Sequence, residues 1–133
     1  MQVCAVSQEQ TKNTMKLLPG LLPAATRKYY GIQLGKLNMY AMGDSRQIEA
    51  VTSSPLALEG GRPTFVIRNE TQNWNSSNGG SDMDGVLSGN AAKREEGVAV
   101  KMLDICNAYR DGEDSVGQKV REAWEGTQGD PDS

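Results

Sequence analysis

Residues 91–126, AAKREEGVAVKMLDICNAYRDGEDSVGQKVREAWEG, decide the fold that the sequence predicts. Between residues 97 and 109 the apolar side chains recur with the period of an α-helix, and charged or amide side chains take the opposite side. A shorter apolar series runs from Val116 to Trp124, after a turn at Gly112. The pattern predicts two helices joined by a short turn, a helical hairpin over about residues 91–126 whose apolar side another element must cover.

Alternation of apolar and polar residues predicts a small antiparallel sheet over about residues 29–69. Its strand segments are residues 29–42, with a slip in phase at a glycine, and residues 46–52 and 64–69. Near the N-terminus, Ser7 to Gln10 matches a capping box, which predicts a helix from about residue 8 to residue 18. The sheet and the hairpin bury their apolar surfaces by packing together, within one chain or across a two-fold dimer. The predicted class is α+β, in one domain over residues 1–133.

Residues 69–90 are rich in Asn, Ser, Gly and Asp, with Trp74 near their start. A polar stretch of this length is typical of a functional loop, of an arm ordered by a partner, or of a disordered segment. Trp74 either folds back onto the sheet or anchors a partner, and the sequence leaves both readings open. Residues 127–133 form a short polar tail.

The composition argues against the common kinds of active site. The chain has no histidine, which removes the usual general base and the zinc–histidine sites. The glycine pairs at residues 60–61 and 79–80 are not followed by the residues of a phosphate-binding loop. Asp82 and Asp84 resemble part of a calcium loop, but the first and twelfth ligand positions hold no oxygen donor. We therefore expect no enzymatic activity, no cofactor and no metal.

Two cysteines, Cys4 and Cys106, are too few for a disulfide scaffold. Cys106 falls on the apolar side of its predicted helix, so two buried free thiols are favoured over a bridge between them. No apolar run reaches the length of a membrane span, and the N-terminus lacks the pattern of a signal peptide. The expected location is the cytoplasm, or the virion if the protein is a coat protein.

The net charge of −3 hides a division between the two parts of the chain. Residues 1–68 carry eight Lys and Arg against four acids, whereas residues 69–133 carry six against thirteen. The basic part either meets nucleic acid, meets the acidic part of a neighbouring copy, or has no special role. Cations between tyrosines suit phosphate neutralisation and base stacking. The nucleic-acid-binding candidates are Arg27, Lys28, Lys36, Arg46, Arg62 and Arg68, with Tyr29, Tyr30 and Tyr40 between them.

Strands followed by two C-terminal helices give an element order similar to that of the coat proteins of small RNA bacteriophages. This likeness is one of element order alone. The low apolar fraction of 37% and the division of charge between the two parts of the chain favour a self-assembling subunit. We therefore predict a non-enzymatic structural protein that forms homo-oligomers and contacts RNA or DNA through its basic strand residues. The alternative is a small monomeric binding module or inhibitor that uses the Trp74 loop. The candidate interface residues are Trp74, Met102, Ile105, Tyr109, Val120 and Trp124.

Overall fold

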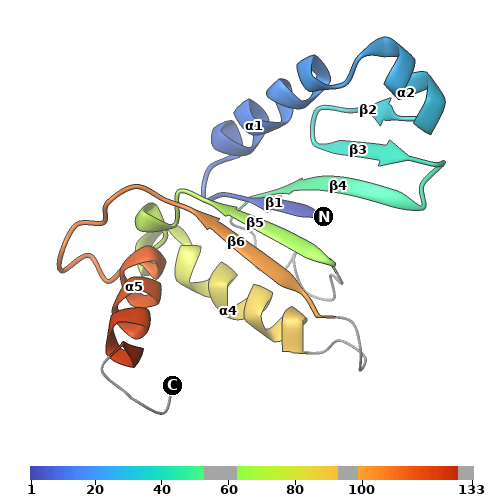
Figure 1. Cartoon of the computed structure of the whole chain (residues 1–133). Helices are drawn as coiled ribbons and strands as arrows, with labels where there is room; N and C mark the ends of the chain where they lie inside the picture. The colour runs from blue at the N-terminus through green and yellow to red at the C-terminus, as the bar shows by residue number, and fades with distance from the viewer. Residues whose placement is uncertain (53–62, 93–98, 129–133) are drawn as a thin grey trace.

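A computed structural model describes residues 1–52, 63–92 and 99–128 of the chain. The element order mixes strands and helices from the first residues onward (Figure 1). The elements are β1 (Gln2–Cys4), α1 (Gln8–Leu21), α2 (Ala24–Tyr30), β2 (Gln33–Leu34), β3 (Asn38–Ala41), β4 (Arg46–Val51), β5 (Phe65–Asn69), the 3-10 turns η1 (Thr71–Asn73) and η2 (Ser76–Asn78), α4 (Gly80–Ala92), β6 (Lys101–Ile105) and α5 (Val116–Thr127).

The strands form one six-stranded mixed sheet in the order β2-β3-β4-β1-β5-β6. β1 pairs in parallel with β4 on one side and with β5 on the other, and β5 pairs in parallel with β6. Only β2, β3 and β4 pair with one another in antiparallel fashion. The sheet therefore has a parallel half, built from β1, β5 and β6, and an antiparallel extension made of β2 and β3.

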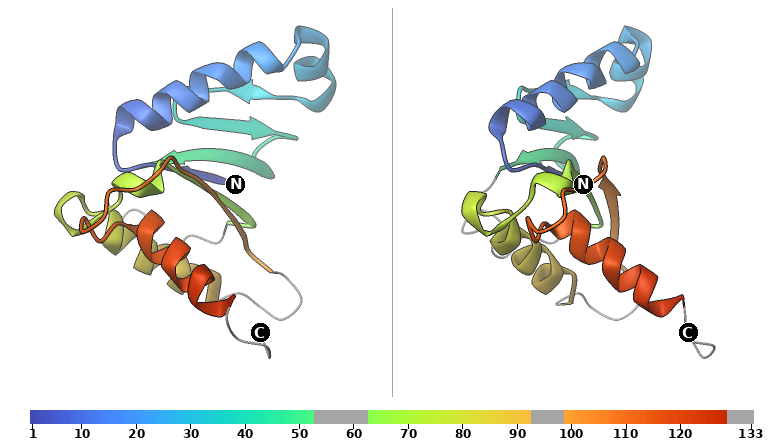
Figure 2. Two further views of the ribbon diagram at one scale, coloured as in Figure 1. Left: turned by 60° about the vertical axis from the view of Figure 1, so that its left-hand side comes forward. Right: turned by 90° about the vertical axis from the view of Figure 1, so that its left-hand side faces the viewer.

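Helices lie on both faces of this sheet. The chain leaves β1 through α1 and reaches β4 on one side, and it leaves β5 through α4 and reaches β6 on the other. Because crossovers between parallel strands are right-handed, two crossovers that run in opposite directions place their helices on opposite faces. Figure 1 shows α1 above the strands and α4 below them, and Figure 2 shows the same separation from two further sides.

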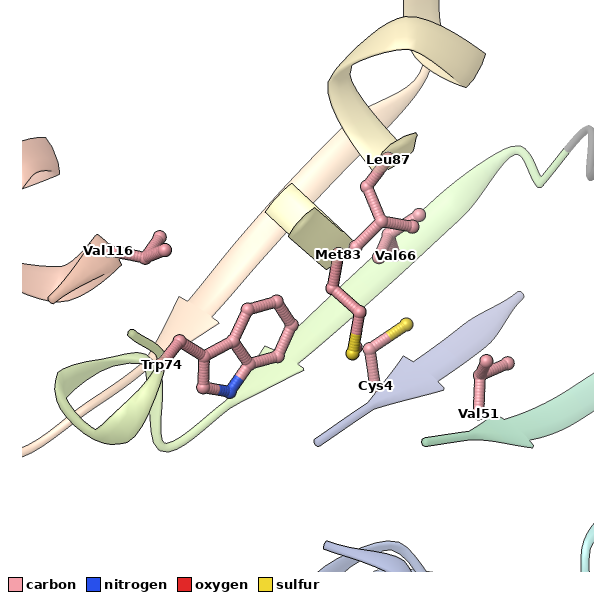
Figure 3. Close-up of a cluster of buried hydrophobic side chains, with 7 residues drawn as sticks. All are labelled: Cys4, Val51, Val66, Trp74, Met83, Leu87 and Val116. Carbon is pink, nitrogen blue, oxygen red and sulfur yellow. The ribbon is translucent and has the colours of Figure 1, made fainter. Parts of the chain in front are cut away.

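The main core lies between α4 and the sheet (Figure 3). Cys4 and Val66 point toward α4 from neighbouring strands, where they meet Met83 and Leu87 of the helix. Trp74, at the turn after β5, is fully buried and closes one end of this cluster. The buried members are Cys4, Val51, Val66, Trp74, Met83, Leu87 and Val116.

The predicted α+β class, with a sheet and a C-terminal helix, is confirmed, as is the helix that follows Ser7. The hydroxyl of Ser7 accepts a hydrogen bond from the backbone of Gln10 at 3.2 Å, as the capping pattern predicted. The strands predicted over 46–52 and 64–69 are β4 and β5. The prediction that the sheet is antiparallel is wrong, because β1 lies between β4 and β5 and pairs in parallel with both.

The prediction of a first helix in the hairpin is wrong, because the central residues of that segment form the strand β6 (Lys101–Ile105). Exposure alternates along β6, with Met102 and Asp104 half-buried and their neighbours exposed. The run of apolar residues fits a helical period and a strand period equally well. The pairing with β5 decides between the helix and the strand, because a helix cannot pair with a strand.

Two other predictions need correction. Tyr29 and Tyr30 begin no strand, since they end the short helix α2, which Gly31 terminates in the left-handed conformation. Residues 69–90 are not a polar loop, because they contain η1, η2 and most of α4. Their Asn and Ser side chains cap these elements: the Asn75 carboxamide accepts hydrogen bonds from the backbone of Ser77 and Asn78.

Candidate functional site

The parallel strands end together at one edge of the sheet, and this carboxyl edge is where open α/β sheets bind their ligands. The strand order reverses at β1, which has β4 on one side and the later strands β5 and β6 on the other. Glu70 directly follows β5, and Asn107 lies two residues after the end of β6. The register pairs Asn69 with Ile105, so the carboxyl ends of β5 and β6 lie side by side.

Glu70 has an unusual backbone conformation at this edge. Its φ is 58°, in the left-handed region that residues other than glycine seldom adopt. The Glu70 amide donates to the carbonyl of Ile105 at 2.6 Å, which continues the ladder between the two strands. Met42 and Asp114 share this region of φ, so the conformation supports a site only together with the contacts that hold Glu70 in place.

Gln72 fixes the Glu70 side chain. It is buried, and its amide nitrogen donates to the Glu70 carboxylate. Its oxygen accepts a hydrogen bond from the backbone of Asn107 at 3.2 Å. A single buried carboxamide thus joins the residues that follow β5 and β6, and it holds one oxygen of the carboxylate in a defined position.

The turn beneath Glu70 is clamped by Trp74 and by both helices that start near it. The Trp74 indole donates to the carbonyl of Asn69 at 3.0 Å. A Cβ on Gly80, the first residue of α4, would lie 2.5 Å from the Trp74 Cα. A Cβ on Gly117 of α5 would lie 2.9 Å from the backbone nitrogen of Gln72. Helix α5 also donates a hydrogen bond from Val116 to the Trp74 carbonyl at 2.8 Å. Glu70 therefore sits on a rigid support.

A small polar pocket of about 270 Å³ opens next to this turn. It is lined by Gln72, Asn73, Ala108, Arg110 and Glu113. The Arg110 side chain is largely exposed and has one long ion pair with Glu113, at 3.6 Å. The exposed Asn73 carboxamide and the Arg110 guanidinium in this pocket suit a polar ligand that carries both hydroxyl and anionic groups.

A larger cavity, about 840 Å³, lies at the other end of β1. Its walls combine apolar residues of the antiparallel strands, such as Met39 and Ile48, with Arg46 and Glu49. It lies at the amino end of β1 and contains one acid. We therefore place the candidate site at the carboxyl edge, where Gln72 both lines the small pocket and holds the Glu70 carboxylate.

Arg68 was predicted to contact nucleic acid, and this prediction is wrong for that residue. Its side chain is buried and pairs with Asp104 through two hydrogen bonds, at 2.6 and 2.7 Å, and with Asp84 of α4. Burial by itself lowers the pKa of the Arg68 guanidinium, but the bonds and charges of Asp104 and Asp84 outweigh that effect and raise it. Arg68 ties β5, β6 and α4 together as a fixed cation.

Four other predicted nucleic-acid residues lie around the antiparallel extension. Arg27 and Lys28 belong to α2, Lys36 lies between β2 and β3, and Arg46 begins β4. The rings of Tyr29 and Tyr30 are exposed and meet edge to face, with centroids 4.8 Å apart. Arg62 lies outside the described residues. Arg27, Lys28 and Arg46 thus lie at the end of the antiparallel extension where the Met42 amide donates to the Tyr30 carbonyl, whereas Lys36 lies in the turn at its other end.

The predicted interface residues do not form one surface. Trp74 is fully buried within its own chain, so the prediction that its loop offers the indole to a partner is wrong. Val120 and Trp124 lie one turn apart on α5 and are each about half exposed. Met102 and Tyr109 are partly buried, and Ile105 is exposed on β6.

Both cysteines are free, with Cys4 buried and Cys106 exposed. Cys106 was expected to be buried, and it is exposed because it follows a strand rather than lining a helix. Burial raises the pKa of the Cys4 thiol to about 12, so Cys4 is a core residue without nucleophilic character at neutral pH.

Across the described ranges, no cluster of three acidic or cysteine side chains is placed to hold a metal ion. Within the same ranges, no helix has both the length and the apolar character needed to cross a membrane.

Comparison with known proteins finds two phage relatives. The chain is 40% identical over 131 residues to the gene 13 protein of Mycobacterium phage D29, covering 95% of this chain and 21% of that protein. It is 41% identical over 128 residues to the gene 13 protein of Mycobacterium phage L5, covering 92% of this chain and 20% of that protein. The chain thus spans about a fifth of the length of these relatives. No family model and no solved structure matches.

Glu70 and Gln72 were not predicted from the sequence as site residues. Their signal was present, since Glu70 is the acid that directly follows the correctly predicted strand over 64–69. The missing information was that this strand is parallel to its neighbours. Only a parallel arrangement makes the end of a strand a common ligand-binding edge.

Proposed function

We propose that the chain is the ligand-binding α/β part of a longer phage protein, and that its carboxyl edge binds a nucleoside phosphate together with Mg²⁺. The observation that supports this most is the position of Glu70, held in a left-handed conformation between the ends of β5 and β6 by Gln72. Doubly wound sheets bind nucleotides at this edge. Mg²⁺ that arrives with phosphates needs only one or two carboxylates from the protein.

In this proposal the Glu70 carboxylate, whose orientation Gln72 fixes, contacts the hydrated Mg²⁺ of the ligand. Arg110, beside the pocket, pairs with the phosphate oxygens, as guanidinium groups do. Asn73 supplies neutral hydrogen-bonding groups. The absence of enzymatic activity stays a prediction from the sequence. Release of phosphate from the nucleotide would contradict it.

Trp74 can report binding, because its indole donates a hydrogen bond to the carbonyl of Asn69, the residue directly before Glu70. In a Trp124→Phe background Trp74 is the remaining tryptophan. We expect titration with Mg²⁺–ATP to change its fluorescence, with a dissociation constant in the millimolar range or tighter, and EDTA to abolish the change. Glu70→Gln should remove binding, whereas the matched change Glu122→Gln, on the exposed side of α5, should preserve it. Equal binding by both variants would contradict the proposal.

A second candidate function is nucleic-acid contact at the antiparallel extension, as the sequence predicted. It is supported by Arg27, Lys28 and Arg46, which lie at the same end of the antiparallel extension as the exposed Tyr29 and Tyr30. Cations that neutralise phosphates and rings that stack on bases are the two components of sequence-independent single-strand binding.

A salt-dependent binding assay with a fluorescent 20-nucleotide single strand tests this second candidate. Reversing two charges in α2, with R27E and K28E, should weaken binding at least tenfold. The matched reversal of Lys12 and Lys16 should have a small effect, because those lysines belong to α1 whereas the tyrosine pair belongs to α2. Similar losses in both variants would indicate attraction by net charge alone.

Self-assembly of a coat-like subunit, in the cytoplasm or the virion, also stays a proposal, with a changed basis. The likeness in element order to small RNA phage coats no longer applies, because β6 replaces the first of the two C-terminal helices. The remaining support is the exposed pair Val120 and Trp124 on α5. Light scattering tests it: a chain that is monomeric at micromolar concentration does not self-assemble.

A further inference from the structure

β6 is the last strand of the described sheet, and no element among the described residues covers its outer edge or one of its two faces. β6 pairs with β5 alone among the described strands. Leu103 and Ile105, on the face that points away from α4, are each 47% exposed. Parallel sheets occur with both faces covered, and a free edge is a template for another strand.

The backbone hydrogen bonds identify which groups face the open edge. The Lys101 amide donates to the Thr64 carbonyl at 3.2 Å, and the Ile105 carbonyl accepts from the Glu70 amide at 2.6 Å. Residues of a strand direct their backbone groups alternately to its two sides. The odd-numbered residues of β6 therefore bond toward β5, whereas Met102 and Asp104 direct their N–H and C=O groups outward.

We propose that the β6 edge receives a further strand from the part of the longer phage protein that lies outside these 133 residues, and that the segment joined to this strand covers Leu103 and Ile105. The matched relatives are about five times as long as this chain, so such residues exist in them. The inference stands on the strand geometry and does not depend on the ligand proposed for the carboxyl edge.

A second copy of this chain fits the surface less well. Two β6 strands related by a two-fold axis would pair in antiparallel fashion, with the axis perpendicular to the sheet. That arrangement satisfies the outward backbone groups but leaves Leu103 and Ile105 of both copies on the same uncovered face. A strand that comes with its own connecting segment satisfies the edge and covers the face.

Amide hydrogen exchange tests the proposal at four neighbouring residues. In the isolated chain, the amides of Met102 and Asp104 should exchange at least tenfold faster than those of Leu103 and Ile105, which serve as internal controls. In the full-length D29 gene 13 protein, the four aligned amides should all be protected. Fast exchange at the two outward positions of the full-length protein would overturn the proposal, and this readout decides even if the isolated chain does not fold.

The isolated chain can also be measured at concentrations where its mass is that of a dimer. Protection of the Met102 and Asp104 amides there would assign the edge to a second copy and also overturn the proposal.

A matched pair of variants adds an independent measurement in a chimera that carries this chain in place of the aligned D29 stretch. Leu103→Lys should lower the midpoint of thermal unfolding by several degrees. Leu17→Lys, at an exposed leucine of α1, should leave it unchanged.

Discussion

In the parallel half of the sheet, β1, β5 and β6 share a core with α4 in which Trp74, Met83 and Leu87 are buried almost completely. In the antiparallel extension, α2, β2 and β3 leave Tyr29, Tyr30 and nearby apolar side chains in contact with water. The first half buries its apolar area against a helix and adds a buried ion pair. The second buries Met39 of β3 and otherwise depends mainly on backbone pairing. The two halves should therefore differ in how strongly a side-chain change affects folding.

The largest effect is expected at Trp74, at the centre of the parallel half. Trp74→Ala removes a fully buried indole and its hydrogen bond to Asn69, and it should lower the free energy of unfolding by about 3–5 kcal/mol. Urea denaturation followed by circular dichroism measures this change. A loss below about 1 kcal/mol would mean that the parallel half is not the stable part of the fold.

The ion pairs of Arg68 come next. Arg68→Ala leaves the Asp104 carboxylate, 19% exposed, beside β5 without its partner, and it should cost about 3 kcal/mol. Asp84 is 37% exposed, so water compensates much of its loss, and Asp84→Asn should cost about 1 kcal/mol or less. Chemical denaturation of both variants gives the comparison. Arg68→Ala removes both ion pairs, so equal costs would show that the pair with Asp104 adds nothing to the pair with Asp84.

The link between the candidate site and α5 can be tested with two glycines of the same helix. Gly117→Ala places a methyl group 2.9 Å from the backbone of Gln72, and forcing the two elements apart should cost about 1–3 kcal/mol. Gly126→Ala meets no atom within 4 Å and should stabilise the chain by about 0.5–1 kcal/mol. Thermal unfolding of the two variants should give shifts of opposite sign. Shifts of the same sign would show that α5 does not rest on the turn.

These expectations also separate what the sequence predicts from what it cannot. The capping pattern at Ser7 and the alternation over residues 46–51 and 65–69 are local signals, and the structure follows them. The strand at Lys101–Ile105 is decided by a partner far away in the chain, β5, and its local period is ambiguous. Trp74 lies in a stretch of polar residues, and only its packing with Met83 and Leu87 of α4 makes it a core residue.

The same distinction applies to the candidate site. A buried Gln72 that joins the ends of two strands has no sequence pattern, because the residues it connects lie 35 positions apart at Asn107. Arg68 was read as a surface cation since its two carboxylate partners come from other elements. Contacts between side chains of neighbouring strands can be predicted only when the strand order of the sheet is known.

A smaller, pH-dependent effect is expected at Cys4 in the parallel core. Its pKa is raised by burial from 9.0 to about 12, so its contribution to stability is complete below pH 9 and is lost as the pH rises toward 12. Between pH 8 and 10 this loss should amount to about 1 kcal/mol. The decrease in unfolding free energy over that range should be smaller in Cys4→Ala than in the matched Cys106→Ala, whose thiol is exposed. Identical pH profiles would contradict the burial of Cys4.

The smallest effect is expected in the antiparallel extension, at Tyr29. Its side chain is 83% exposed, and its described ring contact is the edge-to-face pair with Tyr30. Tyr29→Ala should therefore change the free energy of unfolding by less than about 0.5 kcal/mol, as surface substitutions do. If the same variant weakens binding of a single-stranded nucleic acid, the ring contributes to recognition rather than to folding, because stacking on a base needs an exposed face. A large loss of stability would instead place Tyr29 in a core and remove the contrast between the two halves of the sheet.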